Sequence, residues 1–311
     1  MRNLFFYVVI LIGLSCKPPQ GNDDKFDPAK TYQLKLNPAS GSSYAYEVKN
    51  ENSSVLEIDD KEIKNESSTE TQLQCHFDRD SIGNLLLTAA YKKIRLYSKN
   101  GDQVTEAEAS DEVTPFSATQ KILSFLREGK ITVTLDEKGQ VINMRGYEEV
   151  GNKIAAAMDP NDLAGQRAAK EQWERSFGDA LVKKNLDQLF KIFPDSVVAI
   201  GDEWKLTSKQ GGDFPIVVTG MYKLKTINEK IAIIGATGKI SSGADQVVVP
   251  GGGKASIVLT GEQESEFEME KETGMLIACR IKTNIEGVLQ MMGREIPIKI
   301  KTTTTIKGKK L

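Results

Sequence analysis

The sequence predicts an α+β fold, mainly antiparallel β, with two β-sheet halves and a helical segment between them. Three observations support this prediction. Apolar and polar residues alternate along most of the chain after residue 31, as they do in strands with one buried face. Turn-forming residues separate the alternating stretches. A helical spacing of apolar residues is found in the middle of the chain, over 116–128 and from Tyr147 to about Phe193.

The N-terminus has the plan of a secretory signal. Residues 1–15 contain one arginine, then an apolar run that is too short for a lasting membrane-spanning helix, and then the small residue Ser15. Cys16 follows directly. This placement resembles the lipobox of bacterial lipoproteins, in which the chain is cut before the cysteine and the cysteine is acylated. The sequence departs from that pattern at Gly13, where Leu is preferred.

Residues 16–30 are rich in Pro, Gly, Asn and Asp and are predicted to form a linker. Each buried CH₂ of an acyl chain contributes about 0.8 kcal/mol, so two or more chains on Cys16 would give a stable anchor. We therefore expect the membrane to be a partner of the protein through Cys16. The expected location is the cell envelope at the outer membrane, facing the periplasm or exposed at the cell surface.

The first β-rich half is predicted over residues 31–146. Its alternating apolar positions are Tyr32, Leu34 and Leu36, then Tyr44, Tyr46 and Val48, then Leu73, Cys75 and Phe77, then Leu85, Leu87, Ala89 and Tyr91, and then Ile131, Val133 and Leu135. A short helix is expected over 116–128, because Gly129 ends a run of helical spacing. The helical segment is predicted over 147–195, and Pro194 ends its periodic part.

The second β-rich half is predicted over residues 196–311. Alternation resumes after Gly201 and continues to the C-terminus. Its hairpin over 266–288 is similar to the hairpin over 131–150, which indicates either a duplicated β unit or the shared sequence rules of hairpins. The lysines and threonines of 301–310 are expected to form an exposed sheet edge that charge protects from pairing.

Four parts of the chain together carry a family resemblance: Cys16, residues 32–48, the turn at 80–87 and the opening at 200–204. They resemble an uncharacterised family of Bacteroidota lipoproteins that is classed as a domain of unknown function. The resemblance spans nearly the whole mature chain. It implies an extracytoplasmic lipoprotein and supplies no catalytic residues.

Composition excludes several functions. The 41 Lys and Arg residues are balanced by 43 Asp and Glu residues, so no basic field exists to hold nucleic acid. His76 is the only histidine, and the alternation places it on the face opposite Cys75. Neither a Cys-x-x-Cys pair nor an HExxH motif is present. We therefore expect no enzymatic activity, no catalytic residue, no metal site and no cofactor.

Cys75 and Cys279 both share a face with apolar residues and are expected to point into the core. In an oxidising compartment they would either form a disulfide between the two halves or remain two separate buried thiols. A bridge over such a long loop would contribute roughly 4 to 5 kcal/mol in the chain-entropy model.

Two functions fit these observations. The first is non-enzymatic binding of a hydrophobic ligand or of an envelope partner by curved sheets under helices, an arrangement similar to the half-barrel carriers that move lipids between membranes. The second is a structural or adhesive envelope lipoprotein with a solid core and functional surface loops. An apolar cavity of several hundred cubic ångströms would favour the first, and a filled core the second.

Overall fold

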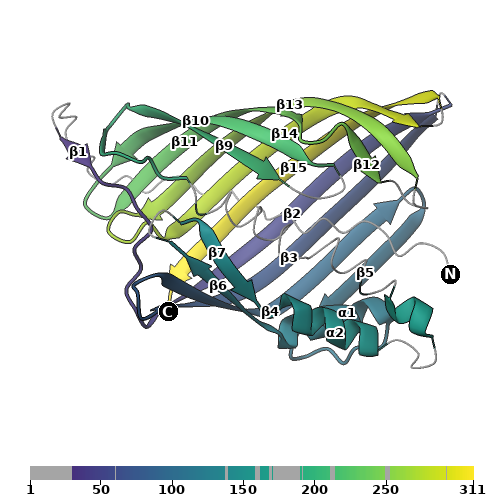
Figure 1. Ribbon diagram of the computed structural model, residues 1–311, viewed down its shortest axis with the longest axis horizontal. Helices are drawn as coiled ribbons and strands as arrows, with labels where there is room; N and C mark the ends of the chain where they lie inside the picture. Colours follow the sequence, from purple (N-terminus) through teal and green to yellow (C-terminus); the bar gives the residue numbers. More distant parts are fainter. Residues whose placement is uncertain are drawn as a thin grey trace.

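One curved antiparallel sheet of 13 strands dominates the protein (Figure 1). The computed structural model describes residues 30–59, 61–136, 139–157, 162–167, 170, 190, 192–210, 214–248, 253–291 and 293–311. The strand order is β7-β6-β4-β3-β2-β15-β14-β13-β11-β10-β9, with β5 paired to β4 and β12 paired to β13. The mainly antiparallel β prediction is therefore confirmed.

The strands of the large sheet are β2 (Ser42–Ile58), β3 (Lys61–Arg79), β4 (Leu85–Asn100), β5 (Gln103–Ala109), β6 (Lys130–Leu135), β7 (Val141–Arg145), β9 (Glu203–Gln210), β10 (Ile216–Ile227), β11 (Ile231–Ser242), β12 (Gln246–Val248), β13 (Lys254–Glu270), β14 (Leu276–Met291) and β15 (Arg294–Lys310). A separate two-stranded sheet pairs β1 (Thr31–Tyr32) with β8 (Val198–Ala199). The alternation at 32–36 thus gives a strand only at its start.

The two predicted β-sheet halves are joined in the structure. The last strand, β15, pairs along most of its length with β2, so the strands of both halves belong to a single sheet. The same pairing overturns the prediction of an exposed edge at residues 301–310, because β15 lies between β14 and β2 in the middle of the sheet. Thr302 and Thr304 are buried on one face, while Lys301 and Lys307 are exposed on the other.

Helix α1 (Ala118–Glu128) confirms the short helix expected over 116–128. It begins with a capping box, in which the backbone N–H of Gln120 donates to Ser117 Oγ and the backbone N–H of Ser117 donates to Gln120 Oε1, both at 3.2 Å. Helix α2 (Tyr147–Ala156) follows β7. Most of the rest of the helical segment predicted over 147–195 lies outside the described residues, so that segment is not confirmed.

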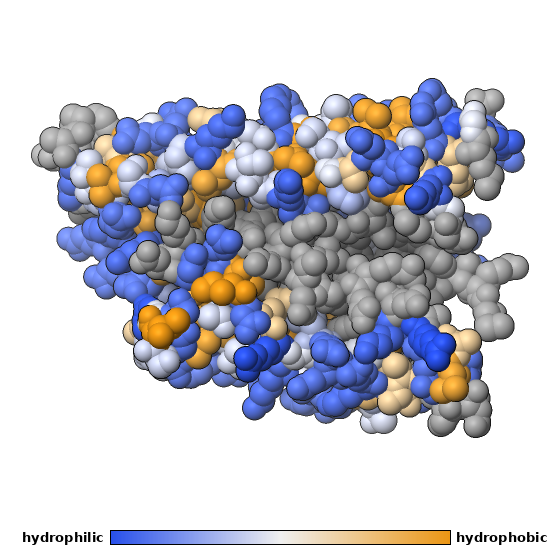
Figure 2. Space-filling model, in the orientation of Figure 1, coloured by the Kyte–Doolittle hydropathy of each residue, from blue (hydrophilic) through white to orange (hydrophobic). Residues whose placement is uncertain are grey.

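The sheet has an inner and an outer face, which we define by β2. The inner face carries Tyr44, Val48 and Leu56 and joins the buried apolar clusters. The outer face carries charged side chains in cross-strand pairs, such as Lys225 with Glu266 at 2.7 Å. Such exposed pairs contribute little to stability, but they show that the outer face is solvated. Figure 2 shows hydrophilic residues over much of the surface of the described part in this view.

Three apolar clusters lie on the inner face. The first, cluster 1, joins β3 to β7 with α1 and α2 and includes Phe77 and Leu135. Cluster 2 joins β10, β11, β13 and β14 around Phe267 and Ile234. Cluster 3 gathers the opposite ends of β10 to β15 around Leu259.

One end of the sheet is closed by two segments that meet there. Residues 33–40 cross this end, and Leu34 and Leu36 are buried in clusters 2 and 1 respectively. The β13–β14 turn meets them, since the backbone N–H of Asn37 donates to Thr273 O at 2.7 Å. Gly274 has a φ of +66°, and a Cβ added there would lie 2.2 Å from Lys35 O. Only glycine allows this close approach.

Glycines also allow neighbouring strands to approach closely. A Cβ at Gly287 in β14 would lie 2.0 Å from Val258 O, and one at Gly308 in β15 would lie 2.2 Å from Leu276 O. A side chain at either position would push the backbone of the next strand away. Glycine inside a strand is typical of such close contacts and of tight bends.

Candidate functional site

The inner face of the sheet is the candidate functional site. It carries three neighbouring cross-strand rows, which the register of the strands defines. The middle row, called here the polar row, runs Leu206, Gly220, Gly238, Gln263, Thr283, Thr302, Asn52, Ser67, Ser98 and Thr105.

The row on the cluster 2 side of the polar row is called the first flanking row. It runs Trp204, Tyr222, Ala236, Ser265, Ile281, Thr304, Asn50, Thr69, Leu96 and Ala107. The second flanking row, on the cluster 3 side, runs Ser208, Val218, Ile240, Gly261, Ile285, Ile300, Ser54, Asn65, Asn100 and Gln103. No Asp, Glu, Lys or Arg stands in any of the three rows.

Aromatic side chains form one end of the inner face. The rings of Trp204 and Tyr222 are stacked with centroids 6.0 Å apart, and those of Tyr222 and Phe267 with centroids 6.2 Å apart. Burial, with a smaller effect from the nearby Cys279, raises the pKa of Tyr222 to about 12. The phenol is therefore neutral at physiological pH, and the three rings make a continuous uncharged surface.

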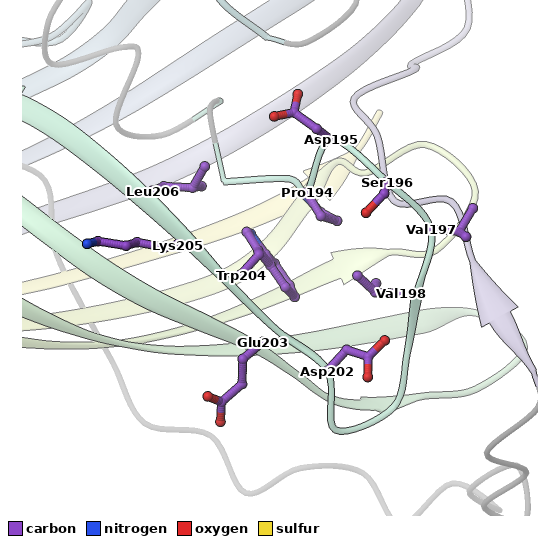
Figure 3. Close-up of a pocket in the computed structure, with 10 residues that line it drawn as sticks. All are labelled: Pro194, Asp195, Ser196, Val197, Val198, Asp202, Glu203, Trp204, Lys205 and Leu206. Carbon is purple, nitrogen blue, oxygen red and sulfur yellow. The ribbon is translucent and has the colours of Figure 1, made fainter.

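A pocket of about 350 Å³ lies beside this aromatic surface (Figure 3). The indole of Trp204 lies at the centre of the lining residues, with Pro194 and Val198 close to it. Trp204 Nε1 donates to Ile192 O at 3.0 Å, which fixes the orientation of the ring. Asp202 also lines the pocket, and its Oδ2 accepts from the backbone N–H of Ala199 at 2.8 Å. Asp195, Glu203 and Lys205 also line the pocket, so polar and charged groups surround the apolar ring of Trp204.

The structure places His76 on the outer face, as the alternation predicts. Ser43 Oγ lies 2.9 Å from His76 Nδ1, and His76 Nε2 lies 3.8 Å from Asp78 Oδ2. These residue types are those of a hydrolytic triad, but all three side chains here are solvated on the surface of β2 and β3. A triad needs a water-excluded site with donors for an oxyanion, whereas the side chains of His76 and Asp78 are about half exposed.

Cys75 and Cys279 are both buried free thiols. Cys75 lies on β3 and Cys279 on β14, with β2 and β15 between them. Three strand spacings of about 4.8 Å give a separation of about 14 Å along the sheet. A disulfide requires Cα atoms within about 7 Å. The sheet therefore does not bring the two cysteines together, and the alternative of two separate buried thiols fits this arrangement.

The remaining predicted features of the site concern the anchor, metals and the membrane. Cys16 lies outside the described residues, so its acylation stays a prediction. Within the described part of the chain, no three His, Cys, Asp or Glu side chains are grouped so that they could hold a metal ion. No helix in that part is long and apolar enough to cross a membrane.

Sequence reasoning missed the polar row. Several of its residues lie in strands that were predicted from their apolar positions, whereas Thr105 lies in β5, which was not predicted. The polar residues show no distinctive pattern when each strand is considered alone. The signal was strongest at Lys301–Thr305, where the run of four threonines places Thr302 and Thr304 on the same face of one strand. Only the register of the neighbouring strands aligns Thr302 with Asn52, Gln263 and Ser67.

Comparison with known proteins gives a family match and matches to solved structures of low sequence identity. The sequence pattern of a family described as "Family of unknown function (DUF6263)" matches residues 82–276. No curated protein sequence matches the chain.

Among solved structures, one titled for lipid–protein interactions in lipovitellin matches with a TM-score of 0.49 and 10% identity over 87% of this chain. The chain spans 25% of that protein's length. The structure of the COG4313 outer membrane channel from Pseudomonas putida F1 matches with a TM-score of 0.24 and 9% identity, covering 92% of this chain and 100% of the channel. Both scores are too low to carry an argument about function.

Proposed function

Because the chain belongs to DUF6263, a family of unknown function, we propose a function from the geometry of its sheet. The protein binds a hydrophobic ligand on the inner face of the sheet and does not convert it chemically. Acyl chains on Cys16 hold it in the cell envelope at the outer membrane. The alternative partner is an envelope protein that binds to the same face through an apolar segment.

The observation that carries this proposal is the contrast between the two faces of one sheet. On β10, Tyr222 and Leu224 point to the inner face, while Lys223 points outward and pairs with Glu203 at 3.1 Å. The inner face offers uncharged and aromatic side chains over many strands, including the stacked rings of Trp204 and Tyr222. A concave apolar surface with a few oriented polar groups is typical of sites for lipids and other small hydrophobic molecules.

An apolar fluorescent dye, 1-N-phenylnaphthylamine, tests the binding directly. We expect saturable binding to the purified protein and displacement by long-chain lipids. Tyr222→Leu should weaken dye binding about 10-fold, because an aromatic contact worth about 1.4 kcal/mol is lost. Met221→Leu is the matched control, since Met221 is the preceding residue on β10 and is exposed on the outer face.

The dye experiment also decides between the two functions. Dye binding that is absent, or that Tyr222→Leu and Met221→Leu alter equally, contradicts ligand binding on the inner face. That outcome favours the second function, a structural or adhesive envelope lipoprotein whose surface loops bind its partners. Thermal unfolding of both variants, measured in parallel, ensures that each one is folded at the assay temperature.

The anchor has its own test. In cells, the protein should fractionate with membranes, and its N-terminal peptide should begin at Cys16 and carry the mass of acyl chains. Cys16→Ala should abolish both the acylation and the membrane fractionation. An unmodified N-terminal peptide from the membrane-bound protein contradicts the proposed anchor and leaves the ligand site on the sheet unaffected.

A further inference from the structure

Along the direction of its strands, the inner face changes from apolar to polar and then back to apolar. Cluster 2 lies on one side of the polar row and includes Val48 and Ile281. Cluster 3 lies on the other side and includes Ile285 and Ile298. A band of hydroxyl and amide groups thus separates two apolar surfaces on the same face of one sheet.

Two asparagine side chains in the rows that flank the polar row have a buried amide oxygen without a hydrogen-bond partner in the described part of the chain. Asn50 lies in the first flanking row and is only 2% exposed, and its Oδ1 accepts no hydrogen bond from the part of the chain that the structure describes. The Oδ1 atom of Asn65, in the second flanking row on the neighbouring strand, is also buried and without a partner there. A buried amide oxygen is costly when unpaired, so the site favours a molecule that donates hydrogen bonds to it.

The charge of the inner face limits which molecule this is. The three rows contain no Asp, Glu, Lys, Arg or His, so the carboxylate of a fatty acid or the phosphate of a phospholipid would be buried there without a counter-charge. Burying an unpaired charge is strongly unfavourable. A plain hydrocarbon would fit the two clusters but would leave Asn50 and Asn65 unpaired.

We infer that the inner face binds an uncharged amphipathic lipid with hydroxyl or amide donors, whose polar group lies on Asn50 and the polar row while its hydrocarbon contacts the clusters on either side. This inference rests on the proposed function and specifies its ligand class. Thr302 and Asn52 are already joined by a hydrogen bond of 3.2 Å between Thr302 Oγ1 and Asn52 Oδ1, so they are oriented before the ligand arrives.

Three probes with the same hydrocarbon chain test the inference. Monoolein is uncharged and has hydroxyl donors, methyl oleate is uncharged and has none, and oleate is charged. Each probe is titrated into the full-length protein, held in amphipol with the apolar dye bound, at a pH where oleate is ionised. The concentration of probe that displaces half of the dye is measured. We expect monoolein to displace the dye at a concentration about 10-fold lower than either of the other two. Equal displacement by monoolein and methyl oleate overturns the inference.

Two variants locate the contact. Asn50→Leu should reduce monoolein binding to the level of methyl oleate and leave methyl oleate binding unchanged, because it removes the amide and keeps a similar volume. Asn284→Leu is the matched control, since Asn284 is exposed on the outer face of β14 and should change neither. If Asn50→Leu does not fold, Asn65→Leu serves the same purpose on β3. Unchanged monoolein selectivity in a folded variant of either residue overturns the inference.

The dye itself separates this inference from the proposed function. A wild-type protein that binds no dye refutes ligand binding on the inner face altogether. A wild-type protein that binds dye, but without preference for monoolein, leaves the proposed function standing and refutes only the ligand class.

Discussion

Replacing Tyr44 by Phe tests how one end of the sheet is closed. The Tyr44 hydroxyl on β2 donates a hydrogen bond to Glu270 Oε2 at the end of β13, at 3.1 Å. β15 and β14 lie between these two strands in the sheet, so the bond joins parts that no direct strand pairing joins. Phe keeps the ring that packs edge-on against Phe77, with centroids 5.8 Å apart, and loses only the hydroxyl.

The expected loss of stability follows from the partners of Glu270. A hydrogen bond to a charged group contributes about 1.5 to 3 kcal/mol. Glu270 Oε2 also accepts from Thr273 Oγ1 at 2.7 Å, so the carboxylate stays paired in Tyr44→Phe. We therefore expect the lower value, about 1.5 kcal/mol. With a urea m value of about 3 kcal/mol/M for a protein of this size, the unfolding midpoint falls by about 0.5 M.

Urea unfolding followed by far-UV circular dichroism measures this shift. Tyr97→Phe is the control, because Tyr97 points to the outer face of β4, and its midpoint should change by less than the equivalent of about 0.5 kcal/mol. In a Glu270→Gln background, the effect of Tyr44→Phe should shrink, because the acceptor is no longer charged. A midpoint for Tyr44→Phe equal to that of the wild type refutes the argument that this bond closes the end of the sheet.

Three further predictions concern stability and reactivity. Because burial raises the pKa of Tyr222 to about 12, the unfolded chain loses this proton before the folded one. The stabilisation that Tyr222 contributes is fully present below about pH 10 and falls as the pH rises toward 12, so that the free energy of unfolding is about 1.4 kcal/mol lower at pH 11. Urea unfolding checks this, because the free energy of unfolding of Tyr222→Phe should fall less at alkaline pH than that of the wild type. Burial likewise raises the pKa of Cys75 to about 12 from 9.0. At pH 8, Cys75 of the native protein should therefore react with iodoacetamide about 1000-fold more slowly than Cys75 of the urea-unfolded protein. Equal rates of modification, measured by peptide mass spectrometry, would contradict the burial of Cys75. Gly287→Ala should lower the free energy of unfolding by about 1 to 3 kcal/mol, since the new Cβ would lie 2.0 Å from Val258 O. An unchanged urea midpoint would contradict this, because it would mean that the backbone of β13 moves away from the new Cβ without loss of stability.

Local patterns predicted much of the secondary structure. Alternation at Tyr44, Tyr46 and Val48 placed these residues on one face of a strand, because side chains in a strand point to opposite faces in turn. Helix α1 was predictable because Ser117 and Gln120 form its cap within four residues of sequence. The exposure of His76 followed from the same alternation. Each of these depends on neighbours in the sequence alone.

Pairing between distant strands was not predictable in the same way. The lysines and threonines of 301–310 suit an exposed edge when the segment is considered alone. Their place in the middle of the sheet depends on β2, which is more than 200 residues away in the chain. The pairing of Cys75 with Cys279 was undecided for the same reason. The apolar neighbours of each cysteine in the sequence do not show that two strands lie between them in the sheet.

The sequence by itself determined the alternation, the turns, the lack of a basic field and the lone histidine, because these are properties of composition and of neighbouring residues. Tertiary structure alone decided that the strands form one sheet and that Asn50, Asn52, Thr302 and Gln263 lie together on its inner face. The physical reason is register. A shift of one residue between two strands would move each of these side chains to the opposite face, and only the pairing of whole strands sets that shift.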